Sequence, residues 1–150
     1  MIRLVGEIFK LCKEDEDYEM YKAIGYDEDE EWYSLKIYFD LDGAKTLKSK
    51  IETAVNEGKS TITVDESHFL EKGQTINKFI MISKKWPYDG YIFEIDYVSN
   101  TLILRMDSEV LESQIIGFNE CIECGEFFPD EICEAKYKDT EIDVLGYLIQ

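Results

Sequence analysis

Alternating apolar and polar positions mark the first part of the chain. Residues 32–39 place Leu35, Ile37 and Phe39 on one face, which is the pattern of a strand with one buried side. The segment 2–11 is apolar on both alternating faces and predicts a strand before it. The alternation of residues 18–26 predicts another strand between these two. We therefore expect three strands joined by turns into a meander.

The period of the pattern changes after this region. Over residues 43–57 the apolar side chains recur at helical spacing, with Asp42 placed to cap the start of a helix and Gly58 to end it. Further along, the pattern predicts strands, a hairpin, a second helix and a closing strand. Their ranges are 61–64 and 76–83 for strands, 91–106 for the hairpin, 107–116 for the helix and 142–149 for the last strand.

These elements predict the α+β class, with a largely antiparallel sheet of about seven to eight strands and two helices. The regular alternation of strands and helices in a doubly wound parallel sheet is absent from the pattern. No internal repeat is visible, and no linker divides the chain. We expect one α+β domain spanning residues 1–150.

Charge narrows the classes of partner. The 150 residues carry 33 acidic and 16 basic side chains, a formal net charge of −17, while 45% are hydrophobic. A chain this apolar folds, and a chain this acidic does not bind nucleic acid or an anionic membrane through a basic patch. The apolar start is interrupted by Glu7 and Lys10 and predicts a strand instead of a signal peptide, so we expect a cytoplasmic protein.

The acidity is dense in two clusters interleaved with aromatic residues. Acids steer a basic partner during encounter, and aromatic side chains anchor interfaces. The candidate steering residues are Asp15, Asp17, Asp27, Glu28, Asp29, Glu30 and Glu31, and the candidate anchors are Tyr18, Trp32 and Tyr38. The alternative is that the tyrosines only pack on the sheet with their hydroxyls in water.

The residues that catalysis needs are scarce. The only histidine, His68, falls in a polar segment that predicts a loop over 66–75. No phosphate-binding glycine loop and no nucleophile elbow is present. An enzyme using carboxylates would need a closed cavity and an acid with a raised pKa. We therefore expect a protein that is not an enzyme and carries no catalytic residues.

One cysteine motif has metal-ligand spacing. The run Cys121-Ile-Glu-Cys124-Gly125, with Cys133 after it, resembles one knuckle of a zinc ribbon. A structural zinc ion would need a fourth ligand, for which Cys12, His68, Asp130 and Glu131 are candidates. The alternative is that the cysteines are free thiols and the protein holds no cofactor.

Size, acidity and the lack of catalytic residues are similar in general character to immunity proteins and nuclease inhibitors, although no motif of a particular immunity family is present. That similarity implies an antitoxin that occludes a basic protein partner such as a toxin. Two alternatives remain open. One is a small zinc-stabilised adaptor that uses the cysteines, and the other is a phage-type DNA mimic with the same acidic surface.

Overall fold

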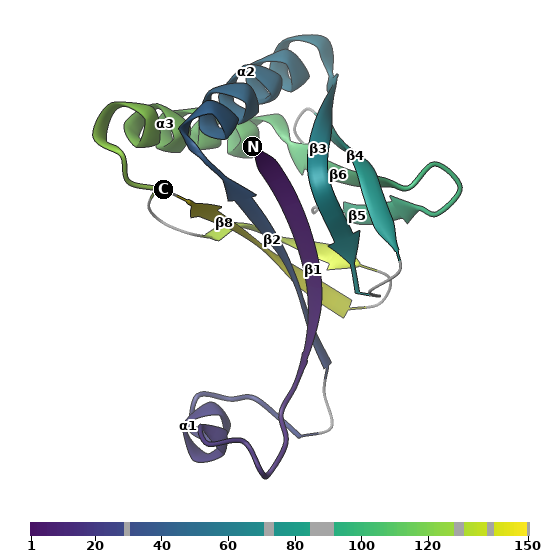
Figure 1. Ribbon diagram of the computed structural model, residues 1–150, viewed down its shortest axis with the longest axis vertical. Helices are drawn as coiled ribbons and strands as arrows, with labels where there is room; N and C mark the ends of the chain where they lie inside the picture. Colours follow the sequence, from purple (N-terminus) through teal and green to yellow (C-terminus); the bar gives the residue numbers. More distant parts are fainter. Residues whose placement is uncertain (29–30, 71–73, 85–91, 128–130, 138–139, 150) are drawn as a thin grey trace.

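The computed structural model describes residues 1–150 except 29–30, 71–73, 85–91, 128–130, 138–139 and 150. Eight strands form one sheet that closes into a barrel (Figure 1). The strands are β1 (Ile2–Lys10), β2 (Glu31–Phe39), β3 (Lys59–Phe69), β4 (Thr75–Lys84), β5 (Ile92–Asp96), β6 (Thr101–Asp107), β7 (Glu131–Tyr137) and β8 (Thr140–Leu148). The helices are α1 (Tyr18–Ala23), α2 (Leu41–Glu57) and α3 (Ser108–Cys124).

The α+β class and the largely antiparallel sheet are confirmed. Around the barrel the order is β1-β2-β8-β7-β5-β6-β4-β3. Each strand forms an antiparallel hairpin with its neighbour in sequence, and the hairpins join side to side by parallel pairs. Two of these parallel joints are long, β2 with β8 and β4 with β6. The other two are short, with two register pairs between β1 and β3 and one between β5 and β7.

The pairing reveals an internal repeat that the sequence pattern does not display. Elements β1-β2-α2-β3-β4 form one half, and β5-β6-α3-β7-β8 form a second half with the same internal pairing. The two long parallel joints connect the halves and exchange places under a two-fold rotation. The chain is therefore a ββαββ unit built twice.

Helices α2 and α3 show the repeat most clearly. Both are 17 residues long, and both start at an aspartate whose side chain accepts a hydrogen bond from a backbone N–H of the first turn. Both end at a glycine in the left-handed conformation, Gly58 at φ 89° and Gly125 at φ 75°. Ile51 of α2 and Phe118 of α3 occupy the same position counted from the caps, and both are buried.

The barrel interior is filled by side chains. Buried side chains of the strands share one core cluster with those of α2 and α3, which lie together at one end of the barrel (Figure 1). At the other end the rings of Tyr33, Phe69, Phe93 and Tyr137 pack with centroids 5.2–5.6 Å apart. A void of about 20 Å³ remains between the helices and the sheet, enough for about one water molecule. This void is too small for a small-molecule ligand.

Several local predictions were wrong. The cap of α2 is Asp40 and not Asp42. Within residues 18–26, Tyr18–Ala23 form α1 and not a strand, so the acidic clusters flank a helix and are not the turns of a meander. His68 belongs to β3, where it is the register partner of Val5, and does not lie in a loop. The second helix extends to Cys124, and β7 was not predicted because its polar and apolar residues were assigned to a loop.

Candidate functional site

The feature that distinguishes the first half is the connection between β1 and β2. Both strands run past the barrel rim, pair with each other up to Lys10 and Glu31, and carry α1 at their far end (Figure 1). We call residues 8–33 the arm. Tyr33 at its root still pairs with Ile142 of β8, whereas the rungs beyond it join only β1 and β2 in the described part of the chain.

The arm has a small core of its own. Phe9, Tyr21, Tyr26 and Trp32 form a cluster with ring centroids 4.5–6.1 Å apart, the closest pair being Tyr26 and Trp32. Leu11 is also buried, at 2% exposure, yet it lies outside the cluster that forms the barrel core. Tilted and edge-to-face packing of this kind stabilises and orients the segment. The arm therefore holds α1 in a defined place.

Glu28 is the polar centre of the arm. Its carboxylate accepts a hydrogen bond from the Tyr18 hydroxyl and lies 3.9 Å from the ammonium groups of Lys13 and Lys22. This places Tyr18 and Glu28 in internal contacts that tie α1 to the segment after it. Trp32 is likewise used inside the aromatic cluster. These three residues, predicted to contact a partner, therefore also position the arm.

The remaining acids of the arm are exposed and uncompensated. Residues 11–30 contain nine acidic and two basic side chains, and both lysines already face Glu28. Among the described residues, no ion pair involves Glu14, Glu16, Asp17, Glu19 or Asp27, all of which are exposed. Asp15 accepts a hydrogen bond from the Cys12 N–H at 2.9 Å, and Glu31 accepts one from the Tyr33 hydroxyl at 3.2 Å. Asp29 and Glu30 lie outside the described residues.

Aliphatic side chains of the arm face solvent. Met20, on α1, is 52% exposed, and Ile24, the residue that caps the C-terminal end of this helix, is 64% exposed. The sequence prediction missed both, because it assigned residues 18–26 to a strand. The signal available was the helical spacing itself.

Tyr38 does not belong with the other predicted anchors. It lies on β2 at the barrel, where its ring stacks on Tyr147 at 5.5 Å and the Arg3 guanidinium lies 5.0 Å from its centroid. Six residues of extended strand separate it from Trp32, or about 20 Å. Tyr38 therefore lies apart from the aromatic cluster of the arm.

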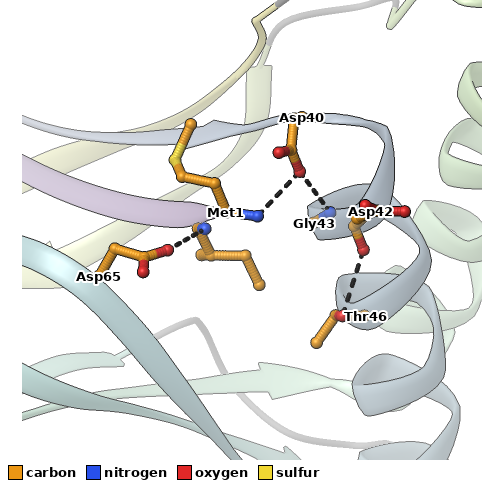
Figure 2. Close-up of polar contacts among 7 residues, drawn as sticks. Met1, Asp40, Asp42, Gly43, Thr46 and Asp65 are labelled. Carbon is orange, nitrogen blue, oxygen red and sulfur yellow. Dashed lines mark hydrogen bonds and ion pairs between the residues drawn. The ribbon is translucent and has the colours of Figure 1, made fainter.

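A surface depression of about 350 Å³ lies where α2 begins, beside the end of α3 and of β8. Figure 2 shows its polar rim, where Asp40 accepts hydrogen bonds from the Met1 amine at 2.8 Å and the Gly43 N–H at 2.7 Å. These donors hold the pKa of the Asp40 carboxyl below its usual value. A general acid needs a raised pKa, so the chemistry of this carboxyl is that of a helix cap. The described residues that line the depression include no histidine or cysteine.

The structure does not assemble the predicted zinc site. Cys121 is buried in α3, Cys124 is exposed at the end of the same helix, and Cys133 is buried on β7. Gly125 ends the helix and does not turn two sulfurs toward one ion. Burial, reinforced by Glu131, Glu134 and Asp143, raises the pKa of the Cys133 thiol to about 12, which opposes the thiolate that zinc requires.

Among the described residues, potential ligand atoms converge within 4.8 Å only at Glu131, Glu134 and Asp143. These carboxylates sit on β7 and β8, where Glu134 and Asp143 are direct register partners. Burial, together with the charges of Glu131 and Glu141, raises the pKa of Asp143. Like charges placed opposite one another destabilise a sheet, so this cluster is a local electrostatic cost of the acidic composition.

Comparison with known proteins leaves the site to be interpreted from its own geometry. No protein family, curated protein or solved structure matches the chain. In the described part of the chain, none of the helices combines the length and apolar character needed to cross a bilayer.

Proposed function

We propose that this protein is a stoichiometric inhibitor of immunity-protein type, which binds a basic toxin or nuclease through the arm and occludes it. The observation that carries the proposal is the arm itself, an acidic projection present in one half of a repeated fold and replaced by a tight turn in the other. Its aromatic core supports a rigid presentation, which limits the entropy lost on binding.

Electrostatics supports the same role. The exposed acids extend beyond the barrel, and both lysines of residues 11–30 face Glu28. Such a predominantly acidic projection raises the rate of encounter with a cationic surface and repels acidic proteins. Salt screens exposed charges over about 8–10 Å, so the association should weaken steeply as ionic strength rises.

The test compares two charge-matched variants with the wild type. The arm variant carries Glu14→Gln, Glu16→Gln, Asp17→Asn and Asp27→Asn. The control variant carries Glu112→Gln, Glu120→Gln, Glu123→Gln and Glu126→Gln, which removes four exposed acids from α3 and its end. Each protein is immobilised, exposed to host lysate at low salt and eluted with a salt step, and the eluates are read by mass spectrometry.

The proposal expects one basic protein at one-to-one ratio on the wild type and on the control, and its loss from the arm variant. With that partner purified, neutralising the arm should lower the association rate by about tenfold at low salt and flatten its salt dependence. If the wild type captures many abundant basic proteins and both variants lose them to the same extent, the acidic residues attract basic proteins without specificity and the proposal fails. If the retained partner is a DNA-binding protein, the DNA-mimic alternative is the better description.

A further inference from the structure

The arm sorts its apolar side chains into two groups. The aromatic rings of Phe9, Tyr21, Tyr26 and Trp32 pack on one another, whereas Met20 lies on α1 and Ile24 is the residue that caps its C-terminal end. Both are more than half exposed. The internal contacts of the arm therefore do not account for the position of this pair.

The surroundings of the pair are acidic. Asp17 lies three residues before Met20 and Asp27 three residues after Ile24, and Glu19 adjoins Met20. All three acids are exposed, and no ion pair involves them among the described residues. Two aliphatic groups with a rim of uncompensated carboxylates form the complement of an apolar depression bordered by lysine or arginine.

We propose that Met20 and Ile24 are the anchors of the arm and that they insert into an apolar depression, rimmed by basic residues, on a cationic protein. This inference rests on the proposed function and replaces Tyr18, Trp32 and Tyr38 as the anchoring residues. Methionine suits such a role because its unbranched side chain adapts to irregular apolar surfaces. In this proposal the carboxylates steer the cationic protein during encounter, and the aliphatic pair anchors it in the complex.

The probes are two synthetic peptides of equal length and charge. One is an amphipathic helix of leucine and lysine, and the other has serine in place of leucine. Binding of each fluorescently labelled peptide is measured by anisotropy at low salt and at 0.3 M salt. The anchor variant is Met20→Ser with Ile24→Ser. Its control is Val98→Ser with Ile116→Ser, which removes two exposed aliphatic groups outside the arm.

We expect the anchor variant to bind the leucine peptide about tenfold more weakly than the wild type, a difference of about 1.4 kcal/mol. Its binding of the serine peptide should be unchanged, and the control variant should match the wild type with both peptides. Equal affinities of the anchor and control variants for the leucine peptide overturn the inference. A separate failure, in which the four-acid arm variant binds both peptides as tightly as its α3 control, would overturn the proposed function instead.

Discussion

The two halves of the barrel connect their first two strands, β1 to β2 and β5 to β6, in different ways. In the second half the chain passes from Asp96 to Thr101 through four residues, Tyr97–Asn100, and the Asp96 carboxylate accepts a hydrogen bond from the Val98 N–H at 3.0 Å. In the first half the equivalent rung joins Glu7 to Ser34, and the arm lies between them. The second half shows that hairpin closure does not require an arm.

The difference between the halves distinguishes the elements that the fold requires from the arm, which it does not require. The caps, the buried helix positions and the strand pairing recur in both halves, so we expect them to stabilise the fold. The arm has a separate core and exposes acids and aliphatic groups that contribute nothing to the barrel. Substitutions in the arm should therefore affect binding, and substitutions at repeated positions should affect stability.

The largest expected effect comes from making the halves alike. Replacing residues 8–33 with Tyr-Val-Ser-Asn, the turn of the second half, should abolish partner binding, a loss of more than about 100-fold if steering and anchoring each contribute about tenfold. The barrel should still unfold cooperatively in urea. Its stability should fall by about 1–2 kcal/mol, because the ring contact between Tyr33 and Tyr137 is lost. A variant that binds as before would contradict the separation of the halves.

The next largest effect concerns the paired core positions. Phe118→Ala should lower the free energy of unfolding by about 4 kcal/mol and Ile51→Ala by about 3 kcal/mol. The Phe118 ring contributes more because its centroid lies 5.4 Å from that of Phe39 and 4.9 Å from that of Phe127. The exposed residue Ile116 on α3 is the control, and Ile116→Ala should change stability by less than about 0.5 kcal/mol.

Denaturation by urea checks this pair with two probes, tryptophan fluorescence and far-ultraviolet circular dichroism. The two long parallel joints connect the halves, so we expect both variants to lose all structure in one transition. Two separated transitions would show that the halves are independent.

The third prediction is the sign of a change in stability, for which helix propensity and a steric clash predict opposite results. Gly43 and Val110 occupy equivalent positions in the first turns of α2 and α3, but a Cβ on Gly43 would lie 2.1 Å from the Met1 carbonyl oxygen. Helix propensity alone predicts that Gly43→Ala stabilises by about 0.5–1 kcal/mol. The steric clash predicts destabilisation by about 1–3 kcal/mol, which we expect urea titration to show. A more stable variant would mean that the start of β1 yields easily.

The smallest effect is a dependence on pH at the α2 cap. The pKa of Asp40 is lowered in the folded state, so its contribution is present above the ordinary pKa of about 4 and is lost as the pH falls through the lower folded value. Asp40→Asn should therefore cost about 0.5 kcal/mol at pH 7, since the group is half-exposed, and progressively less as the pH falls below about 4. Urea midpoints across this range measure it, with Glu112→Gln as the control for loss of one exposed charge.

Sequence patterning predicted the elements whose periodicity is unambiguous. The strand over 32–39, the helix over 43–57 and the hairpin over 91–106 correspond to β2, α2 and the β5-β6 pair. It failed at residues 18–26, because Tyr18, Met20, Lys22 and Ile24 satisfy a two-residue period while Met20 and Ile24 also satisfy a helical one. In a short segment the tertiary contacts of Tyr21 and Tyr26 decide between the two.

The repeat was hidden for a physical reason. Matched buried positions of the two helices hold different residue types, with Ala44 corresponding to Leu111, Ile51 to Phe118 and Ala54 to Cys121. The acidic clusters are recognisable in the sequence from their density, but composition does not tell which aromatic side chains are used internally. That distinction required the contacts of Glu28 and Trp32.

The joint between β2 and β8 carries a kinetic consequence. It pairs Tyr33 with Ile142, so the first half leaves one side of β2 open until nearly the whole chain is available. Pairings this distant in sequence slow folding, to roughly milliseconds to seconds for barrels of local hairpins closed by remote strands. During that interval β2 and β4 are unprotected edges, which can pair with another chain. The high negative charge of the chain would then keep these partly folded molecules apart through mutual repulsion.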